Sequence, residues 1–282
     1  MASVNMSPTL YGRHGSQTKV ISIASGKGGV GKTTITSQMA LCLQDAGNRV
    51  LILDGDLGMA NVEIMFGVRP TKHLGHVIGG ECSVKDAICR LDKNIDLLPG
   101  GSGIYEMSKI STQAKAQLID HVSELGSQYD YMLVDTAPGI EDHVLFLNSA
   151  AQQIVVVLTP DPSSLADSYA LMKVLNNQYR ETRFSVICNQ VKDESHGKRL
   201  FSKINDITSR FLYVSLDYLG SIPHDKDLRQ AIQSQKLIVR SNPQAVSSVS
   251  IGEIANKLNG YQTIDKCKGS LQFFWRQLLG VA

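Results

Sequence analysis

The sequence lacks the features that mark several protein classes. No stretch approaches the ~20 continuous apolar residues of a membrane-spanning helix, and the first residues lack the basic-then-apolar pattern of a secretory signal. We therefore expect a soluble protein of the cytoplasm. The five cysteines are scattered and include no C-x-x-C pair, and the seven histidines show no metal-ligand spacing. This pattern argues against a zinc or iron–sulfur site and fits a reducing compartment.

A strong charge of one sign is also missing. The chain has 28 lysines and arginines against 26 aspartates and glutamates, which gives a formal net charge of +2. Proteins that bind nucleic acid through a broad surface carry a clear basic excess. We therefore expect no direct nucleic-acid partner, although the overall charge does not exclude a local basic patch. With 282 residues, 43% of them hydrophobic, the chain is long enough for one large α/β domain, which we prefer to two small ones.

A glycine-rich stretch is the most informative part of the sequence. It fits the pattern G-x-x-x-x-G-K-[ST] at every fixed position, and it lies between a strand-like apolar run and a helix-like segment. Its residues are Gly26, Lys27, Gly28, Gly29, Val30, Gly31, Lys32 and Thr33, followed by Thr34. Glycines let backbone N–H groups approach phosphates closely, and the N-terminus of the following helix completes the anion site. We therefore predict that this stretch, the P-loop, binds the phosphates of ATP.

Three side chains of the P-loop have predicted roles of their own. Lys32 should reach the β- and γ-phosphates, and the Thr33 hydroxyl should bind Mg²⁺. Lys27 stands directly after the first glycine, where an ordinary P-loop needs no charge. We predict a role in catalysis for Lys27, and a lysine that is merely solvated at the surface is the alternative.

Carboxylates stand at the ends of two apolar runs. Residues 50–53 and 131–134 are apolar at successive positions, as in strands of a parallel sheet that is buried on both faces. The first run is followed by Asp54 and Asp56, and the second by Asp135. Ligands of such sheets bind beyond the carboxyl ends of the strands, so these carboxylates should lie beside the P-loop. We predict that Asp56 orients the attacking water and contacts Mg²⁺, that Asp135 binds Mg²⁺, and that Asp54 is structural. A simple Asp-Gly turn is the alternative, but it would explain only one of Asp54 and Asp56.

Two further segments complete the predicted site. A switch that senses the γ-phosphate should form directly after Asp135, from Thr136, Ala137, Pro138 and Gly139. Asn189 follows the apolar run 184–188, and its amide can donate to and accept from the edge of adenine at once. An asparagine that only forms a turn is the alternative.

Strand-like and helix-like segments alternate along most of the chain. This spacing predicts right-handed βαβ units, and hence an α/β fold with a mostly parallel sheet flanked by helices on both faces. Residues 1–18 are rich in serine, glycine and asparagine without periodicity, and we expect a flexible leader there. One ATPase domain should follow over residues 19–260, and then a linker and a C-terminal helix over residues 261–282.

The C-terminal segment has the periodicity of an amphipathic helix. Its apolar residues recur at positions i, i+3, i+4, i+7 and i+8, and they are Leu271, Phe274, Trp275, Leu278 and Leu279. Two interpretations stay open. The helix could lie at an anionic membrane surface with the help of nearby basic residues, or it could dock onto the protein's own core or into a groove.

The P-loop sequence resembles that of a known family. Lys27 and the residues after it match K-G-G-x-G-K-[ST], the deviant Walker A signature of the MinD/ParA family. The resemblance implies a MinD-like P-loop NTPase fold, ATP hydrolysis, and a homodimer in which Lys27 crosses the interface to the partner's nucleotide. It also implies that Asp56 belongs to a first switch required for hydrolysis, that Asn189 recognises the base, and that the backbone from Pro223 to Asp225 lies over the base. We expect turnover to be slow, because a switch acts through timing.

Other segments are similar to one branch of this family, the flagellar number regulators FlhG and FleN. These segments are 182–186, 197–203, 210–212, 225–231 and 271–274. The resemblance implies an ATPase that dimerises on ATP, visits the inner face of the cell membrane or the cell pole, and restrains a flagellar enhancer-binding transcription activator. It also implies a functional link to the GTPase FlhF. Residues 1–18 contain no Asp-Gln-Ala…Leu-Arg segment of the kind that stimulates this GTPase in some members, which puts direct stimulation in doubt.

Two rival functions belong to other branches. A ParA-like DNA partition ATPase would need a basic surface on the dimer, and salt-sensitive, non-specific DNA binding with ATP would favour it. A cell-division MinD is the nearer rival; the longer leader and the Phe-Phe-Trp tail distinguish this chain from it.

Overall fold

The computed structural model describes residues 18–56, 62–101, 103, 115, 118–119, 122, 125, 128–260 and 271–280. Within these residues, eight strands form one sheet in the order β3-β4-β2-β5-β1-β6-β7-β8. Neighbouring strands are parallel except β3 and β4, which form an antiparallel pair at one edge. The strands are β1 (Lys19–Ala24), β2 (Val50–Gly55), β3 (Cys89–Asp92), β4 (Ile95–Pro99), β5 (Tyr131–Thr136), β6 (Gln153–Leu158), β7 (Arg183–Val191) and β8 (Ser215–Pro223). The prediction of an α/β fold with a mostly parallel sheet is confirmed.

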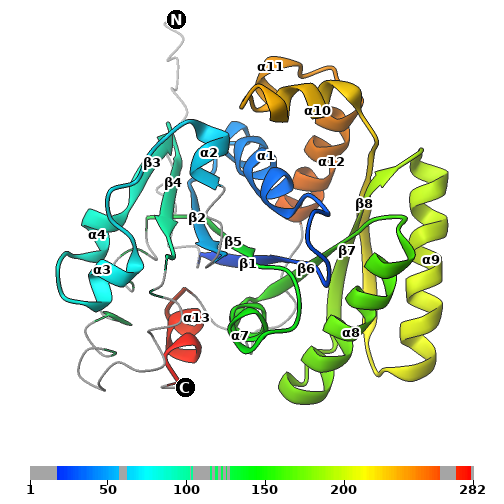
Figure 1. Cartoon of the computed structure of the whole chain (residues 1–282), viewed down its shortest axis with the longest axis horizontal. Coiled ribbons are helices and arrows are strands. Elements are labelled where there is room, and N and C mark those ends of the chain that lie inside the picture. Colours follow the sequence, from blue (N-terminus) through cyan, green and yellow to red (C-terminus); the bar gives the residue numbers. More distant parts are fainter. Residues whose placement is uncertain are drawn as a thin grey trace, which may run out of the picture.

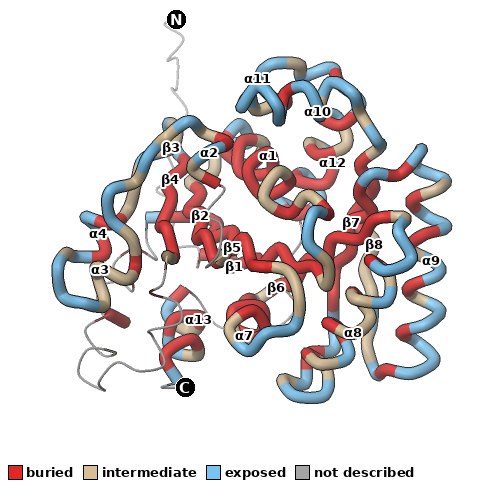
Figure 2. The backbone as a smooth tube through the Cα atoms, viewed as in Figure 1, coloured by how far each residue is buried: buried red, intermediate tan, exposed pale blue. Residues whose placement is uncertain are grey.

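Helices cover both faces of this sheet (Figure 1). Those described are α1 (Lys32–Asp45), α2 (Val62–Phe66), α3 (Leu74–Ile78), α4 (Val84–Ala87), α7 (Asp142–Ala150), α8 (Pro162–Tyr179), α9 (Glu194–Phe211), α10 (Lys226–Gln233), α11 (Ile238–Ser241), α12 (Val246–Gly260) and α13 (Leu271–Leu278). Successive strand residues point to opposite faces. Ile21 and Ile52 therefore pack with α1 and α12, whereas Val20 and Leu51 pack with α7 and α13. Figure 2 shows the centre of the sheet buried, and β2, β5 and β6 are buried at every residue.

The C-terminal helix α13 is docked onto the core. Leu271, Phe274 and Trp275 are 0% exposed, and Leu278 and Leu279 are 6% and 1% exposed. They share a hydrophobic cluster with residues of β1, β2, β5 and α7. Burial of such an apolar face stabilises the fold by roughly 25 cal/mol per Å². In this conformation α13 is docked, as one of the two interpretations predicted, and the apolar face that would meet a membrane is covered by the core.

The docking of α13 also buries a polar group. The indole nitrogen Nε1 of Trp275 is buried and has no hydrogen-bond partner among the described residues. An unpaired buried donor costs about 1–3 kcal/mol. The apolar contacts of α13 therefore hold it in place against this penalty.

The predicted leader and linker lie at the limits of the residues that the structure describes. The expected flexible leader, apart from Thr18, and the linker 261–270 lie outside the described residues. Thr18 is 1% exposed and its Oγ1 donates to the carbonyl oxygen of Tyr129 at 2.9 Å. The folded domain therefore includes Thr18. None of the helices in the described ranges is long and apolar enough to cross a membrane.

Candidate functional site

The P-loop connects the central strand β1 to α1, and its backbone depends on glycine. Gly29 and Gly31 have φ angles of 77° and 95°, in the left-handed region that glycine adopts at little cost. Gly26 has a different reason. A Cβ atom at Gly26 would lie 2.1 Å from the carbonyl carbon of Asp167, so the loop rests directly on the backbone of α8. Val30 is 2% exposed and packs into the core beside the loop.

Lys32 points into the site from the first turn of α1. Its side chain is buried, and its Nζ donates to Ser25 Oγ at 2.8 Å. Burial lowers the pKa of Lys32, while the charges of Asp135 and Asp56 act in the opposite direction. The structure therefore brings this lysine and two of the predicted carboxylates together.

The carboxylates come from two neighbouring strands. Asp54 in β2 lies directly opposite Asp135 in β5. Burial, and then the charge of Asp135, raise the pKa of Asp54 to about 7. Asp54 also accepts a hydrogen bond from the backbone N–H of Asp56 at 3.1 Å, a structural role as predicted for this residue. Burial raises the pKa of Asp135 to about 6, against hydrogen bonds from Thr33 and Thr36 and the charge of Lys32.

This set of side chains fits a bound Mg²⁺ ion. The raised pKa values of Asp54 and Asp135 mean that nearby positive charge does not fully offset their burial. A divalent cation would favour their charged forms. Within the described residues, no group of three His, Cys, Asp or Glu side chains could hold a metal ion by itself. Mg²⁺ at nucleotide sites uses one or two carboxylates together with phosphate oxygens and water, so the donors suit an ion that arrives with ATP.

A cavity of about 1090 Å³ opens above these residues. Predicted site residues that line it are Gly28, Gly29, Gly31, Lys32, Thr33, Thr34, Asp56, Thr136, Ala137 and Pro138. Gly139, the last residue of the predicted switch, has a φ angle of 100°, and its N–H donates to the carbonyl oxygen of Ser25 at 3.0 Å. A backbone hydrogen bond thereby ties the switch to the residue directly before the P-loop.

A smaller cavity of about 350 Å³ lies beside the first. Asn189, Pro223 and Asp225 line it, and Gly31 and Gln190 line both cavities. The Nδ2 of Asn189 donates to the carbonyl oxygen of Val30 at 2.7 Å, and its Oδ1 accepts from the N–H of Gln190 at 2.8 Å. In this conformation the amide of Asn189 therefore braces the chain itself, and recognition of a base by this side chain stays a prediction.

The carboxylate of Asp225 accepts hydrogen bonds from other residues of the chain. It caps α10 by accepting from the N–H of Asp227 at 2.8 Å, and it accepts from Ser247 Oγ at 2.7 Å. A contact of this residue with a base would thus use its backbone, as the sequence predicts for Pro223 to Asp225.

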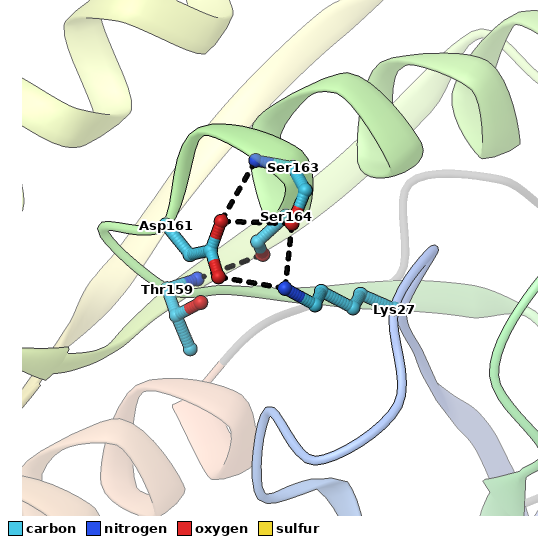
Figure 3. Close-up of polar contacts among 5 residues, drawn as sticks. All are labelled: Lys27, Thr159, Asp161, Ser163 and Ser164. Carbon is cyan, nitrogen blue, oxygen red and sulfur yellow. Dashed lines mark hydrogen bonds and ion pairs between the residues drawn. The ribbon is translucent and has the colours of Figure 1, made fainter.

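Lys27 turns away from the cavity. It is not among the described residues that line the large cavity. Its Nζ lies 2.6 Å from Asp161 Oδ2 and 2.5 Å from Ser163 Oγ, at the start of α8 (Figure 3). The sequence did not predict this pairing, because Asp161 is 134 residues away along the chain.

Several cavity residues escaped the sequence analysis. Glu141 and His143 follow the predicted switch, and extending that segment would have found them. Gln190 and Gln235 have φ angles of 56° and 51°, which non-glycine residues rarely adopt and which concentrate at functional sites. Only the backbone geometry reveals this signal.

The parallel sheet, the glycine-dependent loop between β1 and α1, the buried lysine and the carboxylate at the end of β5 together define a P-loop nucleoside triphosphatase.

Comparisons with known proteins specify the family. The ParA family model, described as an NUBPL iron-transfer P-loop NTPase, matches residues 16–259. Antiactivator FleN of Pseudomonas aeruginosa is 37% identical over 261 residues, which cover 93% of this chain and 93% of FleN. The flagellum site-determining protein YlxH of Helicobacter pylori is 33% identical over 267 residues, which cover 93% of this chain and 90% of YlxH. The structure of the MinD cell division protein of Aquifex aeolicus has a TM-score of 0.70 and 26% identity, and covers 87% of this chain and 98% of MinD. This chain belongs to the ParA/MinD family of P-loop ATPases.

Proposed function

We propose that this ATPase is an ATP-dependent, dimerising switch that controls the number and placement of flagella. It restrains a flagellar enhancer-binding transcription activator and acts together with an FlhF-type GTPase. The observation that carries the proposal is the likeness to an antiactivator and to a flagellum site-determining protein over 93% of the chain. A match of this extent includes the surfaces outside the P-loop, where a partner would bind.

The cavity residues suit ATP and Mg²⁺ in defined positions. P-loop residues, Lys32 among them, line the cavity where a triphosphate would lie, and Thr33, Asp56 and Asp135 would hold the ion. Mg²⁺, when bound, neutralises negative charge on the phosphate oxygens. Asp56 lines the cavity and orients the attacking water, while Lys32 stabilises charge at the β- and γ-phosphates.

The position of Lys27 supports a role for a second copy. Its ammonium group lies at the start of α8 rather than over the cavity of its own chain. A cation supplied by a second copy does the work of an arginine finger, so hydrolysis depends on the dimer. ATP drives the switch because it binds the dimer better than the monomer, and the surface formed by the dimer holds the partner until hydrolysis releases it.

Size-exclusion chromatography with light scattering tests this switch. In Mg-ATP the wild type should form a dimer. Lys27→Ala should stay monomeric because it lacks the bridging charge, and Asp56→Ala should stay dimeric because it cannot hydrolyse the bound ATP. A Lys27→Ala variant that dimerises like the wild type would contradict the proposal.

Peripheral binding to the inner face of the membrane, or to the cell pole, is part of the same proposal. It requires α13 to leave the core, because all the apolar residues of its face are buried in this conformation. In the presence of ATP, the full chain should float with liposomes that contain anionic lipid, and a chain that lacks residues 270–282 should not. Two helices in a dimer would bind more strongly than one through avidity. Equal flotation of both proteins would exclude this role for α13.

A further inference from the structure

Lys27 has two hydrogen-bond partners within its own chain. Its Nζ approaches Asp161 Oδ2 at 2.6 Å and Ser163 Oγ at 2.5 Å, and Figure 3 shows the lysine extending from the P-loop to the first turn of α8. The side chains of Lys27 and Asp161 are 38% and 48% exposed. The pair is therefore formed at the surface, where another molecule can reach it.

Asp161 is held in place by hydrogen bonds of its own. It is the N-cap of α8, and its Oδ1 accepts from the N–H of Ser163 at 2.9 Å and from Ser163 Oγ at 2.8 Å. The turn before it is braced by Ser164 Oγ, which accepts from the N–H of Thr159 at 3.1 Å. The hydrogen bond from Lys27 and then those from Ser163 lower the pKa of Asp161 to about 2. The carboxylate is thus charged and correctly placed before any ligand binds.

The P-loop and α8 are also fixed relative to each other. Gly26, the residue directly before Lys27, lies so close to the backbone of Asp167 and Ser168 that no side chain fits between them. Because the loop rests on α8 at this point, backbone packing keeps Lys27 within reach of the start of α8. The pair is a consequence of the fold, and it must break before Lys27 can reach anything else.

We propose that Asp161, assisted by Ser163, is a positioning residue that holds Lys27 within its own chain and competes for it with the triphosphate bound to a second copy. The inference rests on the proposed dimerising function and adds to it a threshold for dimer formation. Asp161 carries one negative charge, whereas a triphosphate carries several, so ATP in a second copy attracts Lys27 more strongly. The partly exposed pair is weak enough to exchange, because such pairs are easily replaced in water.

The substitution Asp161→Asn tests this competition. Asparagine caps helices as well as aspartate does, so α8 should keep its N-cap while the charge that holds Lys27 is lost. We expect the dimer dissociation constant of the full chain, measured by sedimentation with Mg²⁺ and a non-hydrolysable ATP analogue, to fall about two- to fivefold. Ser163→Ala keeps the charge of Asp161 and its hydrogen bond from the N–H of residue 163, but it removes the second partner of Lys27. It should shift the constant in the same direction by a smaller factor.

Asp193→Asn is the matched control. Asp193 is the N-cap of α9, which has 18 residues like α8, and it accepts from the N–H of His196 at 2.7 Å. This variant loses the same charge from the same kind of cap but has no contact with Lys27, and its dimer constant should equal that of the wild type. About 0.5 M NaCl should bring the constants of Asp161→Asn and the wild type together, because salt screens an exposed pair.

The outcomes separate the two proposals. The competition is overturned if the dimer of Asp161→Asn is as strong as, or weaker than, that of the wild type. It is also overturned if Asp193→Asn gains the same dimer strength, or if salt does not reduce the gain in Asp161→Asn. If the wild type forms no dimer with the analogue, or if Lys27→Ala dimerises normally, the dimerising switch itself is wrong and the competition is overturned with it. If those two proteins behave as expected and Asp161→Asn does not, the competition alone is rejected.

Discussion

Asp135→Asn is expected to lower ATP turnover by a factor of about 10²–10³ while it stabilises the nucleotide-free protein above pH 6. The loss of turnover follows because Asp135 would no longer supply a charged ligand at the end of β5. The gain in stability follows because Asp135 is 2% exposed, and its burial is what raises its pKa. A neutral amide of the same shape avoids that penalty and still accepts from the neighbouring hydroxyl groups.

The sign of the pH dependence follows from the pKa of Asp135. Its value is about 6 in the folded protein and about 3.9 in an unfolded chain, so the folded state binds more protons between these values. The folded protein therefore loses stability as the pH rises from about 4 to about 6, by an amount on the order of 3 kcal/mol. Asp135→Asn removes this loss, so its advantage should be largest above pH 6 and shrink as the pH falls towards 4.

Thermal melts at pH 8 and pH 5, together with a phosphate-release assay, check this prediction. The control is Asp206→Asn, because Asp206 is an exposed carboxylate on α9 that does not line either cavity described above. It should change neither turnover nor the difference between the two melts. Unchanged turnover in Asp135→Asn, or a lower melting temperature than the wild type at pH 8, would contradict the assignment.

Gly26→Ala is expected to destabilise the fold by about 3 kcal/mol or more. The added Cβ would lie 2.1 Å and 2.2 Å from the carbonyl carbon and oxygen of Asp167, and 2.6 Å from the amide nitrogen of Ser168. Both sides of this contact are backbone, so no side-chain rotation can relieve it. The P-loop and α8 would have to separate, and we expect nucleotide binding to be lost together with stability. Urea unfolding followed by circular dichroism measures the first effect, and binding of a fluorescent ATP analogue measures the second.

Two other glycines provide controls for this substitution. At Gly28, in the same loop, the nearest atom to an added Cβ is Pro138 Cγ at 3.6 Å, so Gly28→Ala should retain the unfolding free energy of the wild type. At Gly252, within α12, an added Cβ meets no atom within 4 Å, and alanine there should stabilise the helix by up to about 1 kcal/mol. A Gly26→Ala protein as stable as these two would mean that the loop does not rest on α8.

The core of the candidate site could be predicted because its signals are local. The P-loop pattern specifies a strand, a glycine turn and a helix within a few residues, and parallel strands place their carboxyl ends at one edge of a sheet. Those two facts together bring Lys32, Asp56 and Asp135 to one place before any coordinates are known. The structural role of Asp54 also followed from its position closer to the sheet, and the structure adds that it supports the backbone N–H of Asp56.

Other parts could not be predicted, because they depend on contacts between segments far apart in the chain. Gln190 and Gln235 line the cavity with backbone angles that their residue types do not suggest. The amide of Asn189 pairs with Val30, which lies 159 residues earlier. Residue type indicates that such a side chain can form hydrogen bonds, but the choice of partner belongs to the packed chain.

The sequence by itself determined the family's phosphate-binding loop, the parallel sheet and the carboxylates beside it, because each depends on short-range pattern and on the geometry of a strand. Only the tertiary structure decided where Lys27 points and which surface the apolar face of α13 covers. A long lysine and an amphipathic helix are each compatible with several surroundings. What selects among them is the neighbour that folding brings within reach: a capped helix end for Lys27, and the hydrophobic face beside α7 for Trp275.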